Sequence, residues 1–199
     1  MDAQQHTRHD RAMSMEEDNL FPQKSITTNR LRLRLPRLSD AAAIYEGYAT
    51  CIDITRYLMW SPHESLESTQ CFLKAAIEAW TVNAGERDWV IEEIHAERPV
   101  AIGMIGITVS SHSVEVGYVL GASYQSRGYM TEALSVVTGS AFSDPAIHRI
   151  YATCHVDNTV SRRVLERCGY ELEGRLRRYA RYPNCTPQIC DSYLLSKVR

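Results

Sequence analysis

A polar loop of four residues, Gln-Ser-Arg-Gly at 125–128, precedes an apolar segment with the pattern of a helix. The first turn of a helix has unpaired backbone N–H groups and a partial positive charge, so phosphate oxygens bind well there. Gly128 permits a positive φ or a close approach of the backbone, and Arg127 can pair with a phosphate. We therefore expect this loop to hold a phosphate group. The alternative is a simple turn between a strand and a helix.

The best candidate for a proton acceptor is Glu115, which lies inside the apolar segment VEVGYVL at 114–120. A carboxylate in a buried strand is costly unless it faces water or a partner. Glu115 is therefore either a base that faces a cleft or a member of an ion pair or a solvated face. Asp88 and Glu92 are weaker candidates for the same role.

A further polar pair, Asn158 and Ser161, lies at the start of a helix predicted over 160–169. Both side chains can accept hydrogen bonds from the free N–H groups of a helix start. The spacing therefore indicates helix capping as readily as it indicates contact with a ligand.

The predicted strands and helices that position these residues follow one another along the chain. Period-2 and period-3.6 apolar patterns, with Gly and Pro between them, mark the boundaries. Strands are predicted over 26–35, 88–94, 100–109, 114–120, 149–156 and 192–198, and helices over 41–49, 64–84, 131–143 and 160–169. This order predicts an α/β (α+β) fold in which a mixed sheet is flanked by helices.

The composition is that of a soluble globular protein, with 44% hydrophobic residues in 199 and a net charge of −2. This charge offers no electrostatic basis for binding nucleic acid. No apolar run approaches the ~20 residues needed to span a bilayer, so we expect no membrane partner. Residues 1–24 are polar and aperiodic and are predicted to be a flexible N-terminal extension, and residues 25–199 a single domain.

The six cysteines are scattered along the chain and form no C-x-x-C pair. Without a disulfide framework or a signal peptide, they are expected to be free thiols in a reducing compartment. The sequence therefore predicts a cytoplasmic protein, and its spacing shows no cluster of metal ligands.

The loop at 125–130 resembles Q-x-x-G-x-G/A, the pyrophosphate-binding signature of the GNAT superfamily of N-acetyltransferases. Met130 replaces the usual small final residue but retains the backbone N–H. The segments RGYMTEAL at 127–134 and DNTVSRRVLERCGYELEGRLR at 157–177 resemble the Rim-type branch, which acetylates the N-termini of ribosomal proteins. This resemblance extends from about residue 26 to the end of the chain.

The resemblance implies a mostly antiparallel GNAT-like sheet and acetyl-CoA as cosubstrate, with no metal. It implies that Glu115 accepts the proton of the amine, that Ser161 protonates the coenzyme sulfur, and that a backbone N–H near Val119 stabilises the oxyanion. The expected contacts to the coenzyme are Tyr118, Val119, Leu120, Gln125, Ser126, Arg127, Gly128, Tyr129, Met130, Thr131, Asn158 and Ser161. The expected wall of the acceptor site comes from Tyr57, Trp60, Trp89, Tyr179 and Tyr182.

These expectations describe an acetyltransferase that is a monomer or a homodimer and moves acetyl directly from acetyl-CoA to a primary amine. A protein N-terminus is the first acceptor to consider. Two alternatives stay open at this point. One is an enzyme that acetylates a small molecule such as an aminoglycoside or a polyamine, and the other is a non-catalytic module that binds acetyl-CoA.

Overall fold

The computed structural model describes residues 21–82, 85–97 and 99–199. These residues form one sheet of eight strands in the order β1-β2-β3-β4-β5-β6-β8-β7. The strands are β1 (Ser25–Thr27), β2 (Leu31–Arg34), β3 (Glu86–Glu93), β4 (Ala101–Ser110), β5 (Ser113–Leu120), β6 (Arg149–His155), β7 (Glu171–Arg181) and β8 (Ile189–Val198). β5 and β6 are parallel and every other neighbouring pair is antiparallel, which confirms the predicted mixed, mostly antiparallel sheet.

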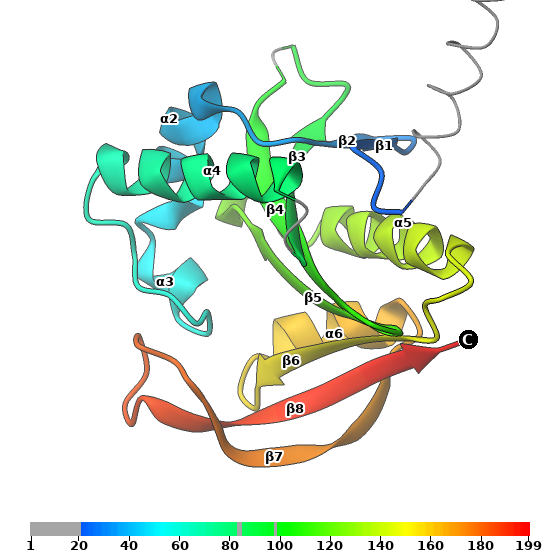
Figure 1. The fold of residues 1–199 in the computed structure, drawn as a ribbon. Helices are drawn as coiled ribbons and strands as arrows, with labels where there is room; N and C mark the ends of the chain where they lie inside the picture. The colour runs from blue at the N-terminus through cyan, green and yellow to red at the C-terminus, as the bar shows by residue number, and fades with distance from the viewer. Residues whose placement is uncertain (1–20, 83–84, 98) are drawn as a thin grey trace, which may run out of the picture.

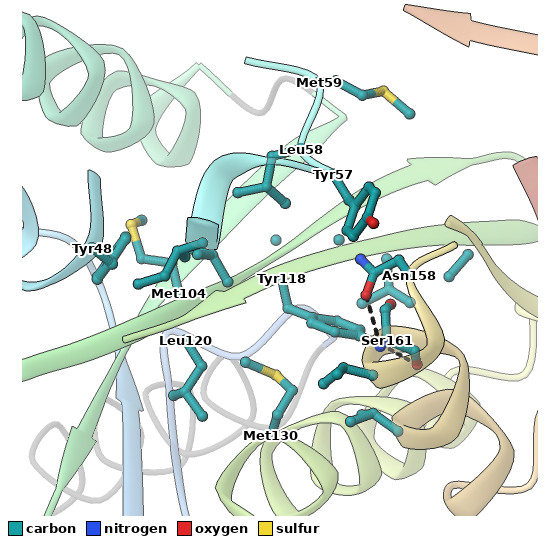
Figure 2. Close-up of a pocket in the computed structure, with 18 of the residues that line it drawn as sticks. Tyr48, Tyr57, Leu58, Met59, Met104, Tyr118, Leu120, Met130, Asn158 and Ser161 are labelled. Carbon is teal, nitrogen blue, oxygen red and sulfur yellow. Dashed lines mark hydrogen bonds between the residues drawn. The ribbon is translucent and has the colours of Figure 1, made fainter. Parts of the chain in front are cut away.

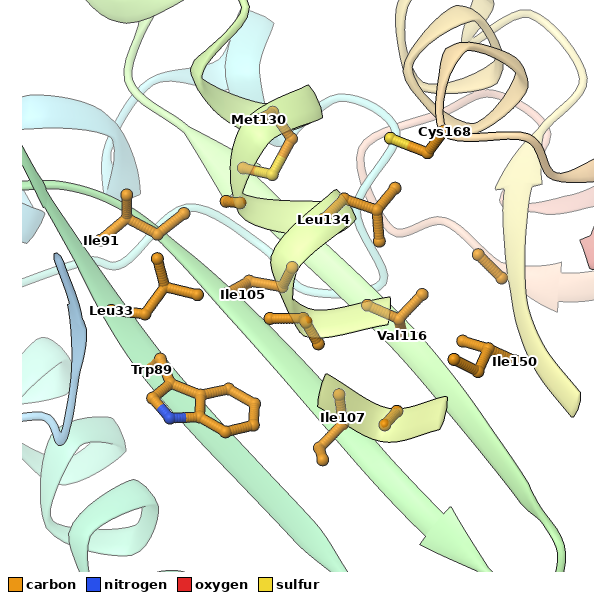
Figure 3. Close-up of a cluster of buried hydrophobic side chains, with 14 of the residues drawn as sticks. Leu33, Trp89, Ile91, Ile105, Ile107, Val116, Met130, Leu134, Ile150 and Cys168 are labelled. Carbon is orange, nitrogen blue, oxygen red and sulfur yellow. The ribbon is translucent and has the colours of Figure 1, made fainter. Parts of the chain in front are cut away.

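Helices cover both faces of this sheet (Figure 1). They are η1 (Leu38–Asp40), α2 (Ala41–Ile44), the π-helical turn η2 (Tyr45–Ala49), α3 (Ile52–Thr55), α4 (Leu66–Thr81), η3 (Ala122–Tyr124), α5 (Tyr129–Ser143) and α6 (Thr159–Arg167). On β4, Ile105 and Ile107 pack towards α5, whereas Met104 packs towards α2 and α4. Figure 3 shows the α5 side of this core. A strand buried on both faces explains why its sequence is almost continuously apolar.

The sheet opens between β5 and β6. The parallel pairing covers only Ser113 to Glu115 on β5, opposite Arg149 to Tyr151 on β6. β5 stays paired with β4 as far as Leu120, so its other edge faces a widening gap from residue 116 onwards. The two strands therefore diverge at Glu115, and the backbone groups beyond that residue face the gap.

Strand β7 was not predicted from the sequence, which placed a loop over much of it. Most of its residues are exposed or half-buried, because β7 is an edge strand that pairs only with β8. Its register also shifts twice, between Leu172 and Gly174 and between Leu176 and Ala180. An exposed, bulged edge strand has no apolar alternation, so periodicity cannot reveal it. Likewise, the single strand predicted over 26–35 is in fact the hairpin of β1 and β2.

The described chain begins in the core. Phe21 is buried beside Ile26 and Trp89, and the Trp89 indole donates a hydrogen bond of 2.8 Å to the Gln23 carbonyl. We therefore propose that residues 21–24 belong to the domain rather than to the extension. The rest of the predicted extension, residues 1–20, lies outside the described residues.

Within the described ranges, no helix has the length and apolar character needed to cross a membrane. All six cysteines lie in these ranges, and each is a free thiol.

Candidate active site

A cleft of about 950 Å³ opens where β5 and β6 diverge. Its walls come from the segment around α3, from the β5 edge, and from the first turns of α5 and α6 (Figure 2). The residues predicted from the sequence that line it are Tyr57, Trp60, Glu115, Tyr118, Val119, Leu120, Gln125, Ser126, Gly128, Tyr129, Met130, Thr131, Asn158, Ser161 and Tyr182. The fold thus brings most of the predicted site residues into one cavity.

The loop before α5 has the backbone shape expected for an anion site. Gly128 caps the helix at φ 78° and ψ 5°, and Ser126 also has a positive φ of 62°. The Gln125 amide nitrogen donates to the Leu120 carbonyl at 3.1 Å, which ties the loop to the end of β5. The first intrahelical bond runs from Glu132 N–H to the Gly128 carbonyl, so the amides of 129–131 have no intrahelical partner.

Arg30 supports this loop from behind, and the sequence did not identify it. Its guanidinium pairs with Glu132 at 2.6 Å, donates to the Arg127 carbonyl at 3.0 Å and lies over the Tyr129 ring. Burial opposes ionisation of Glu132, but hydrogen bonds from Thr28 and Arg30 outweigh it and lower the pKa of the carboxyl. These partners lie about a hundred positions apart in the chain, so no local pattern could have shown them.

Arg127 is a member of the predicted coenzyme site that does not line the cleft. Its guanidinium lies 5.9 Å from the centre of the Tyr124 ring, outside the lining. Two other cations, Arg163 and Arg167 on α6, do line the cavity. Because these are four residues apart on one helix, they face the same side and can meet an anionic ligand together.

Glu115 lies at the point where β5 and β6 separate. It is the last residue of β5 that pairs with β6, and its side chain is half-buried at the cleft. The Tyr151 hydroxyl donates a long hydrogen bond of 3.4 Å to its carboxylate. The predicted base is therefore placed at the floor of the cleft, with one phenol as its partner.

Asn158 and Ser161 both have the contacts of a helix start. The Asn158 side chain accepts from the Ser161 N–H at 3.1 Å, so Asn158 caps α6 (Figure 2). The Ser161 hydroxyl lies 3.0 Å from the Tyr118 hydroxyl. Burial raises the pKa of Tyr118, and its phenol therefore stays protonated. The sequence predicted only backbone contacts at Tyr118, so the pairing of its hydroxyl with Ser161 is a feature that was missed.

Aromatic side chains form the opposite wall. The Tyr57 ring stacks on His155 with centroids 4.7 Å apart, and Tyr182 meets the same imidazole edge-on. Asn184 fixes this wall, because its amide nitrogen donates to the carbonyls of Thr55 and Trp60, each at 2.8 Å. The loop between β7 and β8 is thereby joined to the segment after α3.

Trp89 and Tyr179, two residues predicted for this wall, lie elsewhere. Trp89 is 0% exposed because its position on β3 points into the core beneath α5, on the face away from the wall. Tyr179 is 52% exposed on the edge strand β7 and does not line the cleft. Aromatic type alone does not distinguish core, surface and wall, since strand phase and edge position decide which face a residue occupies.

The two weaker candidates for the base have different environments. Asp88 lines the cleft, and its carboxylate lies over Gly106, with Oδ1 only 2.2 Å from the position that a Cβ there would occupy. Burial and the nearby Glu86 raise the pKa of Asp88 to about 6. Glu92, in contrast, is buried in an ion pair with Arg34 at 2.6 Å and does not line the cleft.

His155 also lies close to two thiols. Ligand atoms of His155, Cys185 and Cys190 are all within 4.8 Å of one another, a cluster that sequence spacing did not show. The Asp157 N–H donates to Nδ1 of His155 at 3.0 Å, and burial lowers the pKa of this imidazole. A neutral ring that accepts at Nδ1 carries its proton on Nε2.

Comparison with known proteins gives matches over most of the chain. A family model described as acetyltransferase (GNAT) domain matches residues 30–171. The chain is 30% identical to an uncharacterized N-acetyltransferase, YoaA of Bacillus subtilis (strain 168), over 90% of this chain and 99% of that protein. It is 27% identical to the [ribosomal protein uS5]-alanine N-acetyltransferase of Escherichia coli (strain K12), over 79% of this chain and 84% of the relative.

The fold is also similar to a solved structure with a bound cosubstrate. This is the microcin C7 self immunity acetyltransferase MccE in complex with acetyl-CoA and AMP. The TM-score is 0.77 at 22% identity, and the match covers 91% of this chain and 99% of that one.

Proposed function

We propose how the cleft transfers an acetyl group and which acceptor it takes, given that the chain belongs to the GNAT acetyltransferase family. The chain is an acetyl-CoA-dependent N-acetyltransferase. The observation that carries the proposal is the separation of β5 from β6 at Glu115, with the helix start at Gly128 on one side and the Ser161 hydroxyl on the other. Such a gap accommodates an extended thioester whose diphosphate and sulfur are held at its two sides.

The loop at 125–131 binds the diphosphate. The amides of 129–131 and the positive end of α5 attract anionic oxygens. Arg163 and Arg167 line the same cavity and offer charge-assisted contacts to phosphate. The exposed edge of β5 beyond Glu115 pairs with the amide-rich arm of the coenzyme, and the Val119 N–H donates to the oxyanion that forms during transfer.

Ser161 and Tyr118 supply the proton that the departing thiolate needs. A thiolate leaves more readily when a positioned hydroxyl protonates it. The two hydroxyls are 3.0 Å apart, and the phenol remains protonated because burial raises its pKa. A carboxylate on the cleft floor, for which Glu115 is the candidate that the sequence identifies, takes the proton of the amine. Both substrates meet in one cleft, so no covalent enzyme intermediate is needed.

The proposed acceptor is a primary amine at a peptide N-terminus. This follows the activity of the Escherichia coli relative, a [ribosomal protein uS5]-alanine N-acetyltransferase, and the aromatic wall of Tyr57, Trp60 and Tyr182 suits the side chains that follow such an amine. A small cationic amine is a second candidate, because carboxylates of Asp53, Glu86 and Asp88 also line the cleft. A cleft lined by acids favours an acceptor that carries positive charge.

Coenzyme binding is tested with the substitution Gly128→Ala. A side chain at φ 78° is strained, and the strain falls on the helix start that meets the diphosphate. We expect affinity for coenzyme A, measured by calorimetry, to fall by about tenfold, because a cost near ~1.4 kcal/mol corresponds to that factor.

The matched control is Gly139→Ala in the same helix, where an added Cβ meets nothing within 4 Å. This variant should bind coenzyme A as the wild type does. Equal affinity in all three proteins, or none in the wild type, would contradict the proposed site. Release of free thiol from acetyl-CoA, measured with an alanine-initiated hexapeptide and with spermidine, then separates the two acceptor classes.

A further inference from the structure

Among the carboxylates that line the cleft, Asp88 and Glu115 lie on the central strands of the sheet and have different surroundings. On β3, β4 and β5, Asp88 pairs with Gly106, and Gly106 pairs with Gly117. Glu115 lies two residues before Gly117 on β5, at the point where the strands separate. Asp88 therefore lies across the sheet from the part of β5 that has separated from β6, whereas Glu115 lies where β5 still pairs with β6.

Gly106 and Gly117, the residues that follow Asp88 across the sheet, contribute no side chains to the cleft. The Asp88 carboxylate occupies the place where a side chain at Gly106 would be, at 2.2 Å from that Cβ position. An added Cβ on Gly117 would meet nothing within 4 Å. The carboxylate thus lies over bare backbone and faces open cleft on the side of the β5 edge that is to hold the thioester.

No hydrogen bond or ion pair to the Asp88 carboxylate occurs among the residues that the structure describes. Trp80 instead contacts the Asp88 backbone, where its indole donates a hydrogen bond of 2.9 Å to the carbonyl. Asp88 is half-buried, and a carboxylate that is partly removed from water without a partner is costly and is characteristic of functional sites.

Tyr48 gives a second, independent indication of a ligand at this end of the cleft. Its side chain is 2% exposed and lines the cavity, and its hydroxyl has no hydrogen-bond partner in the described part of the chain. Burial, together with the charges of Asp40 and Asp88, raises the pKa of this phenol, so it stays protonated. Figure 2 shows Tyr48 beside Met104, across Tyr118 from Asn158 and Ser161. A buried hydroxyl without a partner is expected to find one in a bound molecule.

We propose that Asp88, with Tyr48 beside it, forms the subsite that receives the acceptor's primary ammonium group, and that Asp88 rather than Glu115 takes its proton. This inference rests on the proposed acetyl transfer. The ammonium gives one proton to the Asp88 carboxylate, which passes it to solvent. The neutral amine then forms a C–N bond to the acetyl carbon. As the C–S bond breaks, the thiolate takes a proton from the Ser161 hydroxyl, which is replenished by the second proton of the nitrogen. The sum is ammonium plus thioester giving amide, thiol and one released proton.

No cation is among the titratable groups of the described residues that face Asp88 from β3, β4, β5 and η2. Glu86 on β3 and Glu115 on β5 are acids, Tyr48 from η2 is a neutral phenol, and the β4 residues on this face carry no charge. Burial, followed by Glu86, raises the pKa of Asp88 to about 6, a value near that expected of an efficient base at neutral pH.

The test compares Asp88→Asn with Glu115→Gln at saturating acetyl-CoA between pH 5 and 9, with the alanine-initiated hexapeptide and spermidine as acceptors. We expect Asp88→Asn to lower kcat/KM for the acceptor by about 10²–10⁴-fold and to abolish the fall in rate below about pH 6. Glu115→Gln should keep that acid limb and lose less than about tenfold. A third variant, Tyr48→Phe, should raise KM for the amine more than it lowers kcat.

Affinity for coenzyme A and the melting temperature show whether each variant is folded. The inference is overturned if Asp88→Asn keeps its rate within about threefold and retains the acid limb, or if Glu115→Gln removes that limb. A wild-type protein that transfers acetyl to neither amine defeats the proposed function itself, and this outcome is distinct from the first two.

Discussion

The two ends of β3 carry acids with opposite surroundings, Glu92 buried and Asp88 half-buried. Near its C-terminal end, Glu92 pairs with Arg34, whose guanidinium also binds Asp40 through two hydrogen bonds of 2.7 and 2.8 Å. Near its N-terminal end, Asp88 faces the cleft without such a partner. Burial disfavours the charged form of Arg34, but the hydrogen bonds that it donates to Asp40 and Glu92 outweigh this effect and raise the pKa of the guanidinium.

This difference teaches how to distinguish a structural acid from a reactive one on the same strand. A buried carboxylate that has a fixed cation joins elements together, and here the ion pairs connect β2, η1 and β3. A buried carboxylate without a cation destabilises the fold and is available to a ligand. The contrast predicts opposite signs when each acid is replaced by its amide.

The largest effect is expected at the paired end. Glu92→Gln removes one charge from a buried pair and leaves Arg34 with Asp40 alone, which should lower the free energy of unfolding by about 3 kcal/mol. Chemical denaturation at pH 7 measures this loss. A neutral or stabilising result would show that the Arg34 cluster is not a structural element of the kind described.

The unpaired end should respond in the opposite direction. The pKa of Asp88 is about 6 in the folded protein against an ordinary 3.8, so the folded state holds this proton more tightly than the unfolded chain does. Below about pH 4 both states are protonated, and as the pH rises through 6 the folded state must carry a poorly solvated charge and loses stability. Asp88→Asn, which cannot ionise, should therefore be more stable than the wild type at pH 8 by about 1–2 kcal/mol.

Thermal unfolding at several pH values checks this sign. The stabilisation should diminish as the pH falls and be absent near pH 3.5. A variant that is destabilised at pH 8 would mean that Asp88 has a partner in the folded protein, and the comparison would fail.

The smallest effect concerns Glu86, whose charge is the second cause of the raised pKa of Asp88 after burial. Glu86→Gln should lower that pKa by a few tenths of a unit to about one unit, since exposed charges are well screened. The acid limb of the rate profile should move to lower pH by the same amount. Raising the salt concentration should produce part of this shift in the wild type and little in the variant, and an unmoved limb would assign the raised pKa to burial alone.

Much of the fold follows from local patterns in the sequence. β4, β5 and α5 are strongly apolar segments bounded by polar turns, and the loop at 125–128 contains the glycine that its positive φ requires. β7 was missed because an edge strand buries little and needs no alternation. The division of the predicted strand over 26–35 into the hairpin of β1 and β2 was likewise not visible in the periodicity.

The site was predictable where one segment carries the whole feature and unpredictable where several segments meet. Glu115 and Ser161 lie in the cleft as expected, since strand phase and helix position fix them. The preference for Glu115 over Asp88 came from its place in the apolar segment 114–120 and from the resemblance to GNAT enzymes. The surroundings of Asp88 depend on Gly106 on the neighbouring strand β4 and on Tyr48 in η2. The sequence alone does not show that these residues lie near Asp88.

Asn184 makes one unit of two segments that lie more than a hundred positions apart. Its amide donates hydrogen bonds to the carbonyls of Thr55 and Trp60, so the segments 55–60 and 182–188 are held at a fixed distance from each other. A substitution or insertion in one of these two segments alone would break both hydrogen bonds of Asn184 before it changed the specificity of the site. Replacing both segments together with those of a homologue would preserve these hydrogen bonds. The two segments therefore form the unit whose exchange would change the acceptor that this fold accepts.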